Sequence, residues 1–195
     1  MTTNLLITKF YQPHLSLKQI RRKHLVQRLW QGVESGHRLA LVSAPAGYGK
    51  SMAVAEWLGE LSEEGETPWH TGKVTVSWLS LAPSDNDMGR FFTDFLAALN
   101  QKEDVFCKDL FASLRAGKIP GVDVLVSDLV NAMSAWNILH FLVLDDFHAI
   151  QEKAILDALM SILTHAPLSF HLVLVTREDP PMPLSRMRSR GQSTE

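Results

Sequence analysis

Two spacings of apolar residues alternate along the chain and separate candidate helices from candidate strands. Over residues 22–34, Leu25, Leu29 and Val33 recur at every fourth position and therefore share one face of a helix. Gly36 is placed to end this helix. The same periodicity predicts helices over 50–61, 88–100, 122–135 and 153–165, and a short helix within 104–118.

Short apolar runs lie between these helices and predict buried strands. They cover residues 38–43, 74–81, 141–144 and 171–176. The polar stretch 63–72 contains Pro68 and predicts a loop, residues 184–190 predict one or two helical turns, and a fifth strand is expected to begin near residue 193. Strands that alternate with helices and are apolar on both faces indicate an α/β fold, with a mainly parallel sheet between helices.

Composition narrows the classes of function. The chain has 195 residues, 46% of them hydrophobic, and a net charge of -2, which suits one globular domain and disfavours binding to nucleic acids or membrane surfaces through a basic face. The single cysteine, Cys107, excludes an internal disulfide and is predicted to act as a small core hydrophobe. No apolar run is long enough to span a membrane and no secretory signal is recognisable, so a cytoplasmic location is expected.

A glycine-rich turn between a strand and a helix is the most informative motif. Gly47 and Gly49 let the backbone curl so that its N–H groups converge, Lys50 can reach the β- and γ-phosphates, and the Ser51 hydroxyl can ligate Mg²⁺. Ala44 replaces the usual first glycine, which is compatible with the motif if its φ is negative. The predicted nucleotide-binding residues here are Ala44, Pro45, Ala46, Gly47, Tyr48, Gly49, Lys50, Ser51 and Met52.

A pair of carboxylates follows the apolar run 141–144. Asp145 is predicted to hold Mg²⁺ and Asp146 to polarise an attacking water; the alternative is a strand end with two solvated acids. The separation of 95 positions from Lys50 to Asp145 leaves room for an additional strand between the two motif strands, and 74–81 is the candidate. The predicted fold is thus a three-layer P-loop NTPase sandwich of the additional-strand type.

Several further side chains have two possible roles each. Arg177, after the strand 171–176, is a candidate phosphate sensor or a surface arginine. Tyr48 either packs over a nucleotide or covers the strand, and His148 either orients Asp146 or makes a structural hydrogen bond. One set could act as an arginine finger or form a solvated or interdomain face: Arg186, Arg188 and Arg190. Another is expected to pack in the core: Phe91, Phe92 and Phe95.

Six segments in order resemble one family: TKFYQPHL, RRKHLVQRL, SAPAGYGKS, SWLSLAPSDND, FLVLDDFH and LVTREDPPMPLSRMRSRGQ. The chain resembles the N-terminal nucleotide-binding domain of the MalT-like, LuxR-class activators, which are STAND ATPases related to the AAA+ group. The resemblance implies a switch that ADP holds closed, that ATP and an inducer open for self-association and transcription activation, and that slow hydrolysis resets.

The resemblance also implies roles and boundaries. ATP or ADP with Mg²⁺ would be bound by the residues above, with residues 20–22 (Ile20, Arg21 and Arg22) near the adenine. Residues 1–36 would form a segment on the adenine side, and 37–195 a P-loop core that lacks the family's helical, winged-helix, inducer-binding and C-terminal DNA-binding domains. DNA contact is then expected only through that missing domain, and a fragment is expected.

Three alternatives to the switch stay open. A conventional AAA+ ATPase would use steady turnover as its output, and a P-loop kinase would transfer the phosphoryl group to a small molecule. A non-catalytic fragment would fail to hold nucleotide. Slow hydrolysis with tight ADP retention distinguishes the switch from the conventional ATPase.

Overall fold

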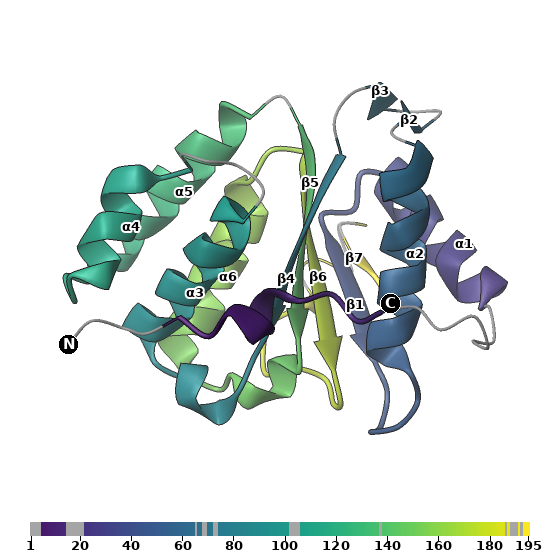
Figure 1. Ribbon diagram of the computed structural model, residues 1–195, viewed down its shortest axis with the longest axis horizontal. Helices are drawn as coiled ribbons and strands as arrows, with labels where there is room; N and C mark the ends of the chain where they lie inside the picture. Colours follow the sequence, from purple (N-terminus) through teal and green to yellow (C-terminus); the bar gives the residue numbers. More distant parts are fainter. Residues whose placement is uncertain are drawn as a thin grey trace.

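The computed structural model describes residues 5–14, 22–64, 66–67, 70–71, 74–101, 106–136, 138–185, 187, 191 and 193–195. Within these residues, five parallel strands form one sheet with helices on both faces (Figure 1). Helices α1 (Lys23–Glu34) and α2 (Lys50–Glu64) cover one face. The other face carries α3 (Met88–Asn100), α4 (Lys108–Arg115), α5 (Val122–Ser134) and α6 (Lys153–His165). The predicted three-layer α/β sandwich is confirmed.

The strands match the predicted apolar runs to within two residues. They are β1 (Leu39–Ser43), β4 (Val74–Ser80), β5 (Leu139–Asp145), β6 (Phe170–Thr176) and β7 (Ser193–Thr194). Short 3₁₀ helices are η1 (Ile7–Phe10), η2 (Pro83–Asp85) and η3 (Phe147–Ala149). The expected fifth strand is confirmed, because β7 pairs in parallel with the start of β1.

The order of strands in the sheet is β4-β5-β6-β1-β7. An additional strand does separate the two motif strands β1 and β5, but that strand is β6, so the prediction of 74–81 for this place is wrong. Among the described residues, β4 pairs only with β5, so it lies at the sheet's edge. The burial patterns give the physical reason: all seven residues of β6 are buried, whereas β4 alternates between half-buried and buried positions along its first half.

The predicted loop over 63–72 is wrong in part. Helix α2 continues to Glu64, because no glycine or proline interrupts its sequence after Gly59. A two-stranded antiparallel hairpin follows, made of β2 (Glu66–Thr67) and β3 (His70–Thr71). The helical turns predicted over 184–190 lie largely outside the described residues, as do Arg186, Arg188 and Arg190.

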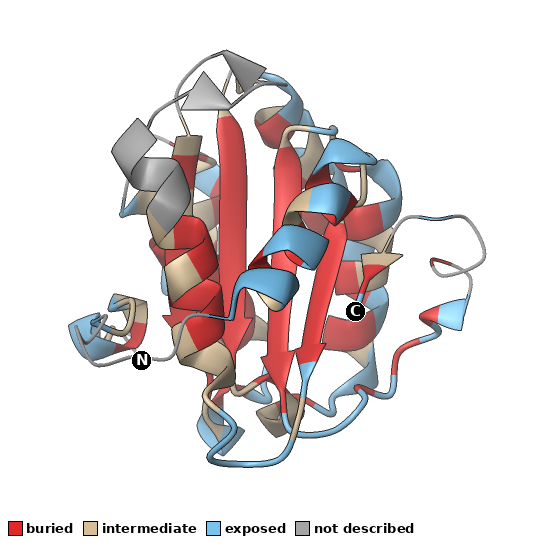
Figure 2. Cartoon of the chain, turned by 90° about the vertical axis from the view of Figure 1, so that its right-hand side faces the viewer, coloured by how far each residue is buried: buried red, intermediate tan, exposed pale blue. Residues whose placement is uncertain are grey.

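The core lies on both faces of the sheet, and Figure 2 shows its strands almost wholly buried. Phe91, Phe92 and Phe95 of α3 are completely buried, which confirms their predicted core role. On the opposite face, the buried Trp57 ring makes an edge-to-face contact with Phe141 at a centroid distance of 5.6 Å.

Cys107 packs against the core at the start of α4 but is half-buried rather than fully enclosed. Its thiol contacts the Asp128 carbonyl oxygen at 3.6 Å, and burial raises the pKa of Cys107 to about 11. A thiol with so high a pKa is a poor nucleophile, which agrees with a packing role. In the part of the chain that is described, no helix has the length and apolar character needed to cross a membrane.

Candidate functional site

The glycine-rich loop joins the carboxyl end of β1 to the amino end of α2. Gly47 and Gly49 have φ values of 83° and 68°, in the left-handed region that side chains disfavour. A Cβ atom at Gly47 would meet nothing within 4 Å, so backbone conformation rather than space requires glycine there. Ala44 is not among the residues of positive φ, which meets the condition under which alanine was expected to be compatible with the motif.

Lys50 is the first residue of α2, so its side chain leaves the helix at the loop. Its Nζ donates a hydrogen bond to the Pro45 carbonyl oxygen at 3.0 Å, which places the ammonium across the loop it follows. The positive end of the α2 dipole lies at the same point. A cation and a helix amino terminus together favour an anionic group at this loop.

Ser51 and Asp145 meet although 94 positions separate them in the sequence. The Ser51 hydroxyl donates a hydrogen bond to Asp145 Oδ1 at 2.9 Å. The Asp146 N–H donates to the same oxygen at 2.9 Å. Burial raises the pKa of Asp145, although these two hydrogen bonds oppose the shift. The structure therefore brings the two predicted metal ligands into direct contact.

The donor set at this contact is a hydroxyl and one carboxylate, both hard oxygen ligands. No cluster of three or more His, Cys, Asp or Glu residues within the described ranges is arranged to hold a metal ion. Mg²⁺ is commonly bound by one or two protein oxygens, with waters and substrate phosphates completing its octahedron. The pair Ser51 and Asp145 fits that mode of binding and does not fit an all-protein cage.

Asp146 lies beside Asp145 in a left-handed conformation, with φ 53°. Its Oδ1 is 3.6 Å from Arg177 Nη2 and 3.8 Å from His148 Nδ1. Arg177 directly follows β6, which is the neighbour of β5 in the sheet, and His148 belongs to η3. His148 Nδ1 is buried and makes no hydrogen bond to any described residue, so the structural hydrogen bond considered for His148 is not made there through this atom.

The amino-terminal side of the site is described only from Arg22 onward, so Ile20 and Arg21 lie outside the described residues. Arg22 Nη2 donates to the Tyr48 carbonyl oxygen within the loop. Tyr48 is 60% exposed, which disfavours the interpretation in which its side chain covers the strand. Met52 is half-buried in the first turn of α2.

Residues to which sequence reasoning gave no role at the site also border it. The N–H of Leu81, just after β4, donates to the Asp145 carbonyl oxygen at 2.9 Å. Asn86 contacts the loop that follows Asp146, and a buried ion-pair cluster joins Lys9 to Asp85. In the sequence, Lys9 and residues 85–86 fall within two of the segments that resemble the family, TKFYQPHL and SWLSLAPSDND, but neither segment indicated a contact with the site.

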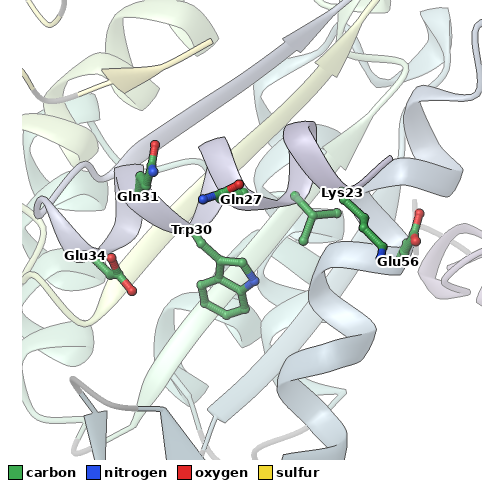
Figure 3. Close-up of a pocket in the computed structure, with 7 residues that line it drawn as sticks. Lys23, Gln27, Trp30, Gln31, Glu34 and Glu56 are labelled. Atoms are coloured by element: carbon green, nitrogen blue, oxygen red, sulfur yellow. The ribbon is translucent and has the colours of Figure 1, made fainter. Parts of the chain in front are cut away.

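A separate pocket of about 540 Å³ lies between α1 and α2. Figure 3 shows the Trp30 indole at its middle, with Glu34 toward one end and Lys23 and Glu56 toward the other. None of its lining residues belongs to the glycine-rich loop or to the carboxylate pair. The phosphate-binding features of this chain therefore do not coincide with this pocket.

Comparison with known proteins places these features in a family. The AAA domain family matches residues 21–179, more than half of the chain. Two curated relatives, the HTH-type transcriptional regulators MalT of Yersinia enterocolitica and of Serratia proteamaculans, are each 30% identical over 191 residues, which is 98% of this chain and 20% of each relative. The chain thus spans about a fifth of the length of these relatives.

Among solved structures, the ORC1 protein of Aeropyrum pernix in complex with DNA has a similar fold, with a TM-score of 0.50 and 13% identity. The similarity covers 89% of this chain and 43% of that one. The resemblance to the MalT-like regulators that the motifs indicated is confirmed over nearly the whole chain. The family match over residues 21–179 agrees with the glycine-rich loop and the parallel sheet, and the chain belongs to the AAA domain family of P-loop proteins.

Proposed function

We propose that this chain is the nucleotide-binding switch domain of a MalT-like regulator, which binds Mg-ATP and Mg-ADP and hydrolyses ATP slowly to reset the switch. The observation that carries the proposal is the hydrogen bond between Ser51 and Asp145 beside a loop with two left-handed glycines and Lys50. The 30% identity to the MalT regulators supports a switch rather than another use of the same loop.

The binding roles follow from the position of each group. Backbone N–H groups of residues 46–51 at the amino end of α2 would bind the phosphates, and Lys50 would exchange its bond to Pro45 for the phosphate oxygens. Ser51 and Asp145 would hold Mg²⁺, which neutralises phosphate charge when it is bound. Because burial disfavours the charged form of Asp145, a cation at this position would stabilise its carboxylate.

The hydrolytic roles are proposed for Asp146 and Arg177. Asp146 is half-exposed and would orient the attacking water and accept its proton. Arg177, 3.6 Å from Asp146, would turn to the terminal phosphate, whose oxygens match its planar guanidinium. The same neighbourhood of β5 and β6 brings both groups to the carboxyl edge of the sheet.

Residues 1–36 are proposed to form the side of the site that contacts the adenine, and residues 37–195 the P-loop core. The contact between Arg22 and the Tyr48 carbonyl supports this division, because it ties the start of α1 to the loop. The segment around η1 instead packs along β4, which Figure 1 shows crossing the edge of the sheet. Within 1–36, the proposal therefore concerns the residues next to Arg22, including Ile20 and Arg21.

The wider activities belong to the longer protein and are proposed by analogy with the relatives. Self-association in the ATP form, control of transcription and a cytoplasmic location are proposed for a protein that carries this domain. DNA would be bound by another domain, because this chain has a net charge of -2. A conventional AAA ATPase is the second candidate, and the family match over residues 21–179 favours it equally.

Calorimetric titration with Mg-ADP tests the proposal. We expect the wild-type chain to bind, and Lys50→Ala to weaken binding by at least about tenfold, because charge-assisted contacts to phosphate contribute roughly 1.5–3 kcal/mol. Lys118→Ala is the matched control, since Lys118 is exposed and lies outside the site, and its affinity should equal that of the wild type. Equal affinities of wild type and Lys50→Ala, or no binding by the wild type, would contradict the proposal.

Steady-state and single-turnover rates separate the two candidates. The switch predicts hydrolysis slow enough for Mg-ADP to remain bound after one turnover. Fast multiple turnover with ready ADP release would instead support the conventional ATPase.

A further inference from the structure

Asp146 lies on a short connection, residues 146–152, between β5 and α6. Its φ of 53° is unusual for a residue other than glycine, and such a conformation persists only where the surrounding structure holds it. Inside the connection, the N–H groups of Ala149 and Ile150 donate to the carbonyl oxygens of Asp146 and Phe147, both at 3.0 Å. These local bonds shape the turn, and the buried side chains of Phe147 and Ile150 pack its middle against the core.

Both ends of this connection are attached to one other segment, residues 81–86, which follows β4. At the first end, the Leu81 N–H donates to the Asp145 carbonyl oxygen at 2.9 Å. At the second end, Asn86 Oδ1 accepts hydrogen bonds from the Gln151 N–H at 2.8 Å and from the Glu152 N–H at 2.7 Å. The single side-chain oxygen of Asn86 thus closes the far end of the loop that carries Asp146.

The segment 81–86 is itself held rigidly by Asp85, which is completely buried. Asp85 Oδ2 accepts from the Ala82 N–H at 2.8 Å, and Oδ1 lies 2.6 Å from Lys9 Nζ and 3.0 Å from Arg90 Nε. Charge-assisted hydrogen bonds of this kind are short and strong. Because Asp85 precedes Asn86 directly, this cluster fixes the backbone from which the Asn86 side chain extends.

We propose that Asn86 is a positioning residue of the nucleotide site, which holds the loop 146–152 so that Asp146 faces the site; this rests on the function proposed above. Asn86 acts through the Gln151 and Glu152 amides and belongs to an element that carries none of the proposed phosphate or metal ligands. Release of the far end would remove the polar attachment of the loop after Phe147 and Ile150, and the Asp146 carboxylate would then be held less precisely.

The variant Asn86→Ala separates this role from a contribution to folding. Asn86 is exposed, so water can replace its oxygen and the free energy of unfolding should fall by only about 1 kcal/mol. Mg-ADP affinity should stay within about twofold, because the glycine-rich loop, Ser51 and Asp145 are held independently. The single-turnover rate of ATP hydrolysis should fall by about tenfold or more, since small misplacement of a reacting group has large kinetic effects.

Two further variants complete the test. Asn86→Asp keeps an oxygen acceptor at the same place and should restore most of the rate. Asn131→Ala removes an exposed asparagine from α5 and should leave the rate unchanged. An unchanged rate in Asn86→Ala, or a failure of Asn86→Asp to exceed Asn86→Ala, would overturn the proposal.

Amide hydrogen exchange measured by NMR gives a readout that does not depend on nucleotide. In Asn86→Ala the Gln151 and Glu152 amides should exchange faster and the Asp146 amide resonance should shift, whereas Asn86→Asp should resemble the wild type. Unchanged amides in Asn86→Ala would overturn the positioning role. If the wild type binds no nucleotide, the function proposed above fails, and these amides still decide whether Asn86 holds the loop.

Discussion

At the scale of single residues, the site depends on groups held in states that they would not adopt alone. Gly47, Gly49 and Asp146 have positive φ, and the carboxyl of Asp145 is buried so that its pKa is raised. The two glycines could be recognised from the sequence, because glycine is the residue that adopts positive φ most readily. The left-handed Asp146 could not, since an aspartate rarely adopts positive φ unless its surroundings impose it.

Asp145→Asn tests the state of the buried carboxyl. Since burial raises its pKa, the charged form is disfavoured in the folded state, and an amide of the same shape removes that penalty while keeping an oxygen for Ser51 and the Asp146 N–H. We expect the metal-free variant to melt at a higher temperature than the wild type near pH 7. The difference should shrink as the pH falls through the pKa of Asp145, because protonation then neutralises the wild type as well.

Thermal melting followed by circular dichroism between pH 4 and pH 8, without divalent cations, measures this difference. Asp157→Asn is the control, because Asp157 is exposed on α6 and the loss of its surface ion pair with Lys153 should not raise the melting temperature. A variant of Asp145 that is less stable than the wild type at every pH would show that the carboxylate is stabilising, contrary to this account.

At the scale of elements, a buried ionic cluster joins the amino-terminal segment to the edge of the sheet. Lys9 is 9% exposed, and its Nζ lies 2.6 Å from both Asp85 Oδ1 and Asp94 Oδ2. Asp85 ends η2 within the site-bordering segment 81–86, and Asp94 belongs to α3, which follows that segment. Burial makes each charge dependent on its partner, because an unpaired charge away from water is strongly unfavourable.

Lys9→Met removes the ammonium but keeps a side chain of similar length. Asp85 and Asp94 would then remain buried with less compensation, and we expect the free energy of unfolding to fall by about 3 kcal/mol. Urea denaturation followed by tryptophan fluorescence measures the change, with Lys118→Met as the exposed control. A loss below about 1 kcal/mol, as is usual for surface pairs, would show that the cluster is solvated in solution.

Features that depend on nearby residues could be predicted from the sequence, whereas features that depend on contacts between distant segments could not. The bounds of α3 and α6 could be predicted because they depend on local signals, such as Asp87, whose carboxylate accepts from the Arg90 N–H at 2.9 Å. The place of β6 between β1 and β5 could not, since strand order depends on contacts between segments far apart. Lys9, Asp85 and Asn86 were missed for the same reason.

At the scale of the whole molecule, the sheet brings three carboxyl-end segments together. The glycine-rich loop follows β1, Arg177 follows β6, and Asp145 ends β5, in the adjacent order β5-β6-β1. Parallel strands of one sheet deliver their carboxyl ends to the same edge, which is where α/β proteins bind ligands. The central claim is that a Mg-nucleotide occupies this edge, with the metal at Ser51 and Asp145, and not the pocket between α1 and α2.

A crystal structure of the chain with a non-hydrolysable Mg-ATP analogue tests this claim most directly. The account predicts phosphates over the backbone amides of residues 46–51 and Mg²⁺ at about 2.1 Å from Ser51 Oγ, with the hydrogen bond to Asp145 replaced. Analogue seated beside Trp30 between α1 and α2, or a glycine-rich loop left empty at saturating concentration, would contradict it.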